Sequence, residues 1–331
     1  MTYRDSSGHT APRHLPFGMR RGALAALALL LASGIVACGE GFGSDRFMSI
    51  GTAGTGGIYY VLGGALASHM SELDPARQYT AEVTGGSVEN VNRVRAGQLD
   101  LAMVLAISAY DAYTGGRDTD QPMENLRIVA PLYPNITHVM VRRGSGIESL
   151  EDLAGARISV GPAGSGTEQI ARQLLEAVGM TYADVRERYL SFAESSSAIQ
   201  DGAIDAAIIS VGYPAAAVLE ATTTAGALLI PITQDILDRL QERYPYYQAG
   251  EIPAGVYRGV TETVPTVAMM NWVVGREELP ADVVDTFLDI LDQRRDQLIQ
   301  VHEMARQIDM ATLQTAPIPL HSATEAWLDR R

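Results

Sequence analysis

The chain contains no lysine, because all 25 of its basic residues are arginine. This absence excludes a Schiff-base lysine, a lysine general base and the lysine of a nucleotide-binding P-loop. Acidic residues number 39, and the formal net charge at pH 7 is −14. Nucleic-acid binding requires basic surface, so the sign of this charge argues against that class of protein.

Cysteine is nearly as scarce, with Cys38 as the single example. One cysteine cannot form an intramolecular disulfide or a thiolate-rich metal site. The six histidines are scattered, and none is paired at a spacing typical of metal ligands. No G-x-S-x-G motif follows a predicted strand. The sequence therefore predicts no catalytic residue, no metal site and no cofactor, and it favours a protein that is not an enzyme.

Residues 1–37 are typical of an export signal. Four arginines precede the apolar run 23–31, which is too short to span a bilayer comfortably. The sequence Ile-Val-Ala before Cys38 resembles the lipobox of bacterial lipoproteins, in which the cysteine is lipidated and becomes the mature N-terminus; a buried free thiol is the alternative. We expect a signal peptide over 1–37, lipidation of Cys38, a tether over 38–46, and an exported, periplasmic, membrane-anchored protein.

A glycine-rich stretch, SIGTAGTGGIYY, runs from Ser49 to Tyr60. An apolar approach precedes it and a helical pattern follows, which predicts a strand, a turn and a helix. Glycines have no side chain to cover the backbone, so the first N–H groups of the helix point at whatever molecule occupies the turn. The positive end of the helix dipole lies behind these groups. An anion is the natural occupant, although a tight connection with nothing bound would show the same pattern.

The same order of elements occurs twice in the chain. The stretch ISVGPAGSGT, residues 158–167, repeats the strand and the glycine-rich turn, and IQDGAIDAAIIS, residues 199–210, repeats VRAGQLDLAMVL, residues 94–105. In each copy a helix ends at a glycine, Gly97 or Gly202, and a buried strand follows an aspartate. Two α/β lobes of one plan, each with a helix N-terminus beside its strand ends, predict a cleft between them.

Two long extended runs, residues 126–141 and 266–274, are expected to join the lobes. We expect a first lobe over 47–138, a second lobe over 139–268, and a return to the first lobe over 269–331.

Shorter elements have weaker patterns. Ser87 is predicted as the N-cap of a helix. Residues 189–192 are predicted as a strand and 195–200 as a helix. The segment 244–257 is rich in Tyr, Pro and Gly, which predicts a covering loop.

Groups suited to binding gather at the predicted helix starts. The segments GTGG, GGS-x-EN and GSGTE supply backbone N–H groups and short hydroxyls, which hold a carboxylate, phosphate or sulfonate without a buried cation. Each hydroxyl taken alone is more often an ordinary helix cap, and Asn90 would equally brace the loop. Neighbours on a helix diverge by about 100°, so of Tyr59 and Tyr60 we expect one to pack and the other to line the cleft.

Together these motifs resemble the TAXI solute receptors of tripartite ATP-independent periplasmic (TRAP) transporters. The resemblance lies in GTAGTGGIYYVLGGALA, TGGSVENVNRVRAGQLDLAMV, GSGIESLEDLAGARISVGPAGSGTE, YPYYQAGEIPAGVY and PIPLH. It implies an α/β, type II periplasmic-binding-protein-like fold, with two lobes joined by crossing strands and a ligand cleft between them. The matching motifs carry the implied ligand contacts onto Thr55, Gly56, Gly57, Tyr59, Ser87, Val88, Asn90, Ser165, Gly166 and Thr167, and near Gly212 and Pro214.

The resemblance also implies a function. A TAXI receptor captures a small carboxylate, such as glutamate or a related acid, and delivers it to the membrane permease subunits of the transporter. This chain departs from the pattern at Leu105-Ala106-Ile107-Ser108, where members often carry a polar residue, commonly glutamine. An apolar wall there changes the distal part of the pocket. Two alternatives stay open, a periplasmic sensor or adhesin-like binding protein and, less favoured, an enzyme on the same fold.

Overall fold

The computed structural model describes residues 47–116 and 121–331. The predicted signal peptide, the tether and Cys38 lie outside the described residues. None of the helices within the described ranges combines the length and the apolar character needed to cross a bilayer.

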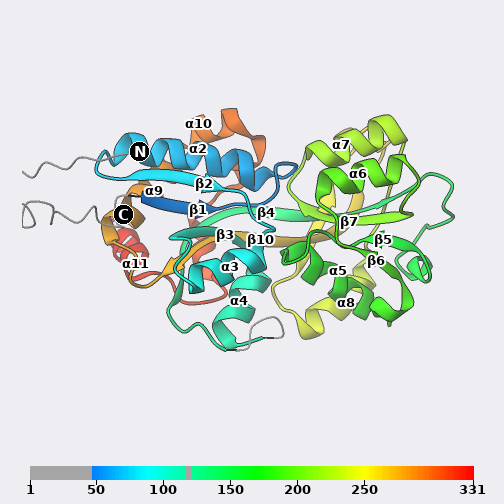
Figure 1. Cartoon of the computed structure of the whole chain (residues 1–331), viewed down its shortest axis with the longest axis horizontal. Coiled ribbons are helices and arrows are strands. Elements are labelled where there is room, and N and C mark those ends of the chain that lie inside the picture. The colour runs from blue at the N-terminus through cyan, green and yellow to red at the C-terminus, as the bar shows by residue number, and fades with distance from the viewer. Residues whose placement is uncertain (1–46, 117–120) are drawn as a thin grey trace, which may run out of the picture. The chain divides into compact units, whose positions relative to one another are not determined.

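One sheet passes through both lobes of the fold (Figure 1), in the strand order β2-β1-β3-β10-β4-β7-β5-β6. Each end of the sheet is parallel, and the central pairings are antiparallel. The strands of the first lobe are β1 (Phe47–Gly51), β2 (Gln78–Glu82) and β3 (Leu101–Leu105). Those of the second are β5 (Arg157–Ser159), β6 (Arg186–Arg188) and β7 (Ala206–Val211), with β8 (Leu228–Ile230) beside β4.

Two long strands, β4 (Leu126–Val141) and β10 (Val264–Arg276), join the lobes. They pair with each other from Leu126↔Arg276 to Ile136↔Ala268. At one end β10 also pairs with β3, and at the other end β4 pairs with β7. The prediction of two lobes joined by crossing strands is confirmed. The predicted lobe boundaries fall within these two strands and stay predictions.

Helices cover both faces of the sheet (Figure 1), so β3 and β7 are buried along their whole length, as expected of strands packed on both sides. The first lobe contains α2 (Ile58–Leu73), α3 (Ser87–Arg95), α4 (Ala106–Thr114), α9 (Ala281–Gln293), α10 (Arg295–Val301) and α11 (Ser322–Asp329). The second contains α5 (Gly166–Ala177), α6 (Phe192–Gln200), α7 (Ala216–Glu220) with a π-helical turn (Ala221–Ala225), and α8 (Gln234–Arg243). Short 3₁₀ turns occupy Glu151–Leu153, Tyr182–Asp184, Glu303–Gln307 and Met310–Thr315.

The repeated G-x-x-D segment takes the same place in both lobes. Gly97 and Gly202 have φ values of 70° and 68°, a backbone region that favours glycine. The Asp100 carboxylate accepts a hydrogen bond from the Ser49 N–H of β1 at 2.8 Å. The Asp205 carboxylate accepts one from the Arg157 N–H of β5 at 3.1 Å. The repeat seen in the sequence is therefore a repeat of backbone architecture.

Three local predictions are wrong. The N-cap of α3 is Gly86, because the Ser87 hydroxyl instead accepts a hydrogen bond from the Leu105 N–H at 3.1 Å. Residues 189–192 are not a strand; the strand β6 ends at Arg188, and α6 begins at Phe192 rather than at residue 195. The predicted loop 244–257 contains a strand, β9 (Gln248–Ile252), which pairs with the start of β10.

Candidate functional site

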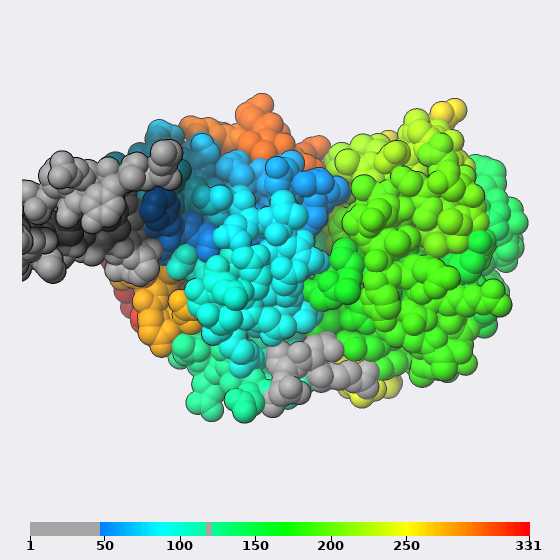
Figure 2. All heavy atoms as spheres, viewed as in Figure 1, coloured from blue at the N-terminus to red at the C-terminus, as the bar shows by residue number. Residues whose placement is uncertain are grey.

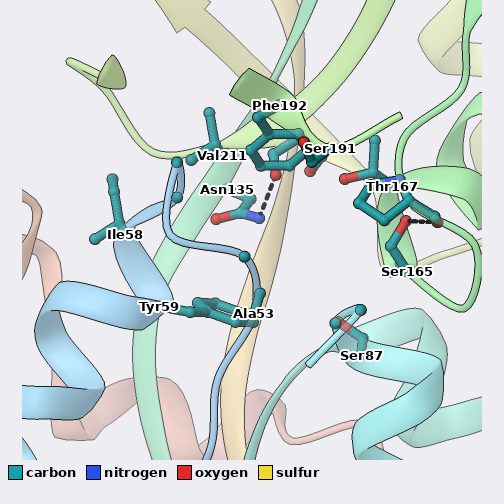
Figure 3. A pocket seen from close by; sticks show the side chains of 18 of the residues that line it. Ala53, Ile58, Tyr59, Ser87, Asn135, Ser165, Thr167, Ser191, Phe192 and Val211 are labelled. Atoms are coloured by element: carbon teal, nitrogen blue, oxygen red, sulfur yellow. Dashed lines mark hydrogen bonds between the residues drawn. The ribbon is translucent and has the colours of Figure 1, made fainter. Parts of the chain in front are cut away.

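A cavity of about 240 Å³ lies where the two lobes meet. Figure 2 shows the blue and cyan surface of the first lobe against the green surface of the second, and Figure 3 shows the interior. The first lobe contributes Ala53–Tyr59, Val83, Gly85–Ser87 and Leu105 to the walls, the crossing strand β4 contributes Tyr133 and Asn135, and the second lobe contributes Pro162, Ser165–Thr167, Ser191–Ala193, Ser210 and Val211.

Four helices begin at this cavity. Their N-cap residues, Gly57 of α2, Gly86 of α3, Ser165 of α5 and Ser191 of α6, all line it. The first N–H groups of a helix have no partner within the helix, and they carry the positive end of its dipole. Two lobes therefore direct four positive helix ends into one small volume, which is an environment that attracts an anion.

The two lobes cap these helices differently. In the second lobe each N-cap serine accepts a hydrogen bond inside its own helix, Ser165 from the Glu168 N–H and Ser191 from the Glu194 N–H, both at 3.2 Å. Glycine offers no side chain for this purpose in the first lobe. At α3, the N–H groups of Val88 and Glu89 instead donate to the Gly164 carbonyl of the second lobe, at 3.1 and 3.0 Å. The first lobe therefore relies on the Gly164 carbonyl of the second lobe to satisfy these two N–H groups of α3.

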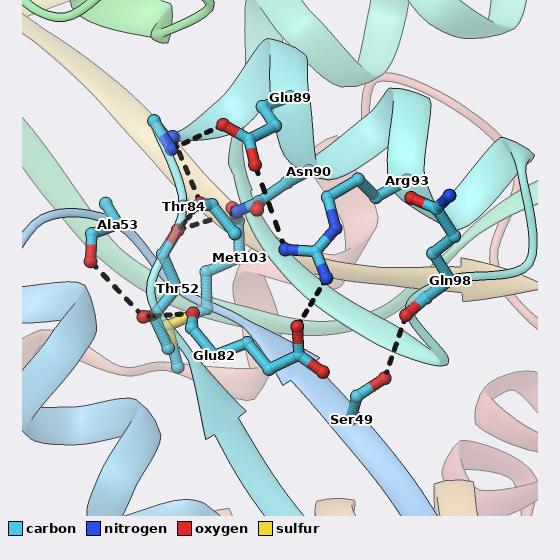
Figure 4. A network of polar contacts seen from close by, with 12 residues as sticks. Ser49, Thr52, Ala53, Glu82, Thr84, Glu89, Asn90, Arg93, Gln98 and Met103 are labelled. Atoms are coloured by element: carbon cyan, nitrogen blue, oxygen red, sulfur yellow. Dashed lines mark hydrogen bonds and ion pairs between the residues drawn. The ribbon is translucent and has the colours of Figure 1, made fainter.

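No charged side chain faces the cavity. Among the described residues that line it, none is aspartate, glutamate, arginine or histidine. Glu89 lies behind the wall, where its carboxylate accepts a hydrogen bond from the Gly85 N–H at 2.7 Å and lies 3.8 Å from Arg93 (Figure 4). The attraction for an anion therefore comes from backbone dipoles rather than from a cation.

A network of amides forms the floor of the cavity. The Tyr59 hydroxyl donates to the Asn271 side chain, and the Asn271 amide donates to the Asn135 carbonyl oxygen and to the Tyr133 backbone carbonyl, both at 2.7 Å. The Asn135 amide donates to the Ser210 carbonyl at 2.9 Å. Burial raises the pKa of the Tyr59 hydroxyl, so this group stays protonated. The network links β10, β4 and β7 beneath the site.

Two hydroxyls of this floor have no partner among the described residues, Tyr133 Oη and Ser210 Oγ. Both residues line the cavity, and they are only 1% and 3% exposed. A buried hydroxyl without a partner costs free energy, about 1–3 kcal/mol, and such groups are uncommon in folded proteins. A bound molecule with a polar atom would supply the missing partner.

Eight of the twelve residues predicted from the sequence line the cavity. They are Thr55, Gly56, Gly57, Tyr59, Ser87, Ser165, Gly166 and Thr167. The expectation that Tyr59 and Tyr60 divide packing and lining between them is wrong, because Tyr59 does both and Tyr60 lies on the surface, 39% exposed.

The other four predicted residues lie behind the walls. Val88 contributes its backbone N–H to the Gly164 contact. The Asn90 amide donates to the Thr52 and Met103 carbonyls, at 2.7 and 2.8 Å (Figure 4), so it braces the glycine-rich turn against β3. A Cβ on Gly212 would lie 2.7 Å from Ile58 Cδ1, and the Pro214 carbonyl is 3.3 Å from His302 Nε2. These positions support the site from outside.

Leu105, from the apolar wall expected at residues 105–108, lines the cavity, but sequence reasoning missed the rest of the apolar lining. Ile58, Phe192 and Val211 gather on one side of the cavity, while Ser87, Ser165 and Thr167 lie on the other (Figure 3). One signal was available, because Ser191-x-x-Glu194 is a capping box and both of its hydrogen bonds form. It places the start of α6, and with it Phe192, at the cavity.

This architecture is that of the two-lobed periplasmic binding proteins. PhnD1 from Prochlorococcus marinus (MIT 9301), solved in complex with methylphosphonate, is 12% identical, with 87% of this chain and 97% of that chain covered and a TM-score of 0.54. A structure described as a periplasmic transporter is 12% identical over 87% and 93% of the two chains, with a TM-score of 0.51. The model of the NMT1-like family matches residues 50–329, and the chain belongs to that family.

Proposed function

We propose that the protein is an extracytoplasmic solute receptor, which captures a small carboxylate in this cavity and delivers it to a TRAP-type membrane permease. The observation that carries the proposal is the convergence of four helix N-termini on one cavity without a charged lining. A protein of the same fold holds an anion, methylphosphonate. The TAXI resemblance supports the choice of permease, and the predicted lipid on Cys38 would keep the receptor at the membrane.

The carboxylate would bind through backbone groups and short hydroxyls. Ile58 and Tyr59, in the first turn of α2, present N–H groups from the first lobe, and Gly166 and Thr167 present theirs from the second. Such bonds to an ionised acceptor contribute about 1.5–3 kcal/mol each. A ligand that contacts both lobes binds their closed arrangement better than an open one, so binding favours closure. The crossing strands β4 and β10 would take up the motion.

The cavity lacks the groups that catalysis of a carboxylate would need. General acid–base chemistry requires a group that titrates near the working pH, and among the described residues that line this cavity the only titratable side chains are Tyr59 and Tyr133. Burial raises the pKa of both, which keeps both protonated at neutral pH. A receptor that returns its ligand unchanged fits these surroundings better than an enzyme does.

Calorimetry on the purified protein tests the proposal, with small mono- and dicarboxylates as probes. Thr167→Val removes one lining hydroxyl and preserves side-chain shape. We expect the affinity for the best acid to fall roughly 10-fold or more, with an unchanged melting temperature of the empty protein. Thr324→Val is the control, because Thr324 is equally buried but donates to the Val129 carbonyl away from the cavity. It should lower the melting temperature and leave affinity unchanged.

Three outcomes would contradict the proposal. Binding of no acid would refute the receptor function, and an unchanged affinity in Thr167→Val would refute the site. Recovery of a chemically altered acid would show an enzyme.

A further inference from the structure

We infer that the cavity selects singly charged acids whose remaining part is uncharged, mostly apolar, and carries one hydroxyl or carbonyl oxygen. Short-chain hydroxy and oxo monocarboxylates have this chemistry, whereas glutamate and dicarboxylates do not. The inference rests on the proposed function and narrows its ligand class.

Charge is the first reason. An amino acid brings an ammonium group and a dicarboxylate brings a second anion, and a buried charge is costly unless it is paired. None of the described lining residues carries a carboxylate for an ammonium group or a guanidinium for a second carboxylate. Glu89 lies behind the wall with its carboxylate engaged by the Gly85 N–H. The helix N-termini favour one negative charge. None of the described residues that line the cavity provides a partner for a second charge of either sign.

The distribution of side chains is the second reason. Ile58, Phe192 and Val211 form the apolar side of the cavity, opposite the hydroxyls of Ser87 and Thr167 (Figure 3). Ile58 is closely backed on this side, since a Cβ on Gly212 would lie 2.7 Å from Ile58 Cδ1. The volume is small beside ligand pockets of about 300–1,000 Å³, so the apolar part of the ligand is short.

The two unpartnered hydroxyls are the third reason. Tyr133 and Ser210 line the cavity, are almost fully buried, and have no partner for their hydroxyl groups among the described residues. A purely hydrocarbon tail would leave both unsatisfied. One neutral oxygen on the ligand accepts from Tyr133 or Ser210 without adding a charge.

A matched series of five-carbon acids tests the inference by calorimetry on the purified protein. The series holds chain length constant: pentanoate, 2-hydroxypentanoate, 2-oxopentanoate and 4-oxopentanoate, then 2-aminopentanoate, glutarate and glutamate. We expect a hydroxy or oxo acid to bind most tightly, and pentanoate to bind roughly 2- to 10-fold more weakly. The three acids with an added charge should bind at least about 100-fold more weakly.

Variants separate the role of the hydroxyls from general packing. In Ser210→Ala, in Tyr133→Phe or in both, the advantage of the best oxo or hydroxy acid over pentanoate should largely disappear. Ser196→Ala is the matched control, because Ser196 is also buried with an unpartnered hydroxyl but does not line the cavity. In Ser196→Ala the best oxo or hydroxy acid should keep its full advantage in affinity over pentanoate.

Glutamate or glutarate binding as tightly as the best oxo acid would overturn the inference and leave the receptor proposal standing. Pentanoate binding as tightly as the oxo acids, or Ser210→Ala and Tyr133→Phe both behaving as Ser196→Ala does, would also overturn it. Binding of none of these or other small carboxylates would refute the receptor proposal together with the inference.

Discussion

The two lobes share a backbone plan but differ in how their helices begin at the cavity. The second lobe begins α5 and α6 with serines that satisfy N–H groups of their own helices. The first lobe begins α2 and α3 with glycines, and two N–H groups of α3 are satisfied by the second lobe's Gly164 carbonyl.

Because of this difference, the helix starts of the two lobes have different roles in ligand binding, although the lobes have similar architecture. A helix start that is already capped has less to gain from a ligand, because one of its orphan donors is satisfied. The start of α2 has no side-chain cap among the described residues, whereas Val88 and Glu89 of α3 already donate to the Gly164 carbonyl. The start of α2 is therefore the more receptive helix start of the first lobe. Five predictions test the comparison of the two lobes, beginning with the largest expected effect.

Gly85→Ala should prevent the lobes from meeting. The added Cβ would lie 2.8 Å from the Ala163 carbonyl oxygen of the second lobe, a backbone atom that cannot turn aside. Overpacking of this kind costs about 1–3 kcal/mol, so we expect affinity to fall up to roughly 100-fold. X-ray scattering should show a larger radius of gyration at ligand saturation than in the wild type.

Gly54→Ala is the matched control for Gly85→Ala, because its added Cβ would meet nothing within 4 Å. It should bind as the wild type does. Wild-type affinity in Gly85→Ala would show that the contact between the lobes is not needed for binding.

Asp100 and Asp205, which occupy equivalent places in the two lobes, should differ in their contribution to the free energy of unfolding. Asp205 accepts hydrogen bonds from the Arg157 N–H and from the guanidinium groups of Arg157 and Arg142, whereas Asp100 accepts only from Ser49. We expect Asp205→Asn to cost about 2 kcal/mol and Asp100→Asn about 1 kcal/mol, after allowance for partial exposure. Urea unfolding at pH 7 measures both, and equal costs would contradict the comparison.

The Asp205 effect should also depend on pH. Hydrogen bonds from Arg157, and further ones from Arg142, hold the pKa of this carboxyl well below its usual range. A lowered carboxyl pKa stabilises the fold above the unfolded pKa of about 4 and loses that contribution as pH falls further. The difference in free energy of unfolding between the wild type and Asp205→Asn should therefore reach its full value at pH 7 and be smaller at pH 3.

Ser191→Ala should destabilise the second lobe's own cap. The change removes the serine side of the capping box with Glu194, which is worth about 1 kcal/mol. The melting temperature of the empty protein should fall by a few degrees. An unchanged melting temperature would show that the second lobe does not depend on its serine caps.

Gly57→Ser should make the first lobe resemble the second, with the smallest effect. A serine at this N-cap would satisfy an N–H of α2, and its Cβ would meet Phe192 at an ordinary 3.6 Å. We expect stability to rise by a few tenths of a kcal/mol and affinity to fall about threefold, because the ligand must displace the new cap. Tighter ligand binding would contradict the assignment of α2 as a receptive helix.

The fold was predictable where burial is uniform. The bounds of β4 match the predicted run, and β7 follows its aspartate as predicted, because both strands are central to the sheet and buried along nearly their whole length. The strand β9 was missed because its residues, Gln248-Ala249-Gly250-Glu251-Ile252, are mostly exposed and show no strand pattern. Its structure comes from pairing with β10, which local sequence does not encode.

The candidate site was predictable where backbone motifs form it. Glycine-rich turns and helix starts, together with the TAXI resemblance, pointed to Gly57, Ser165 and Thr167, and all three line the cavity. Phe192 and Tyr133 were missed, because their approach depends on how the second lobe and β4 pack against α2, which no local pattern expresses. The Ser87 error has the same origin, since its hydroxyl turns to a distant backbone N–H, that of Leu105.

The late position of β10 in the sequence also determines when the first lobe can be completed during synthesis. This strand pairs with β3 and β4 of the first lobe, yet it begins at Val264, after nearly all of the second lobe has been synthesised. The helices α9 and α11, which pack in the first lobe's core, come later still. Contacts between segments so far apart in sequence form slowly. A nascent chain therefore holds an unfinished first lobe until α9 and α11 have been made.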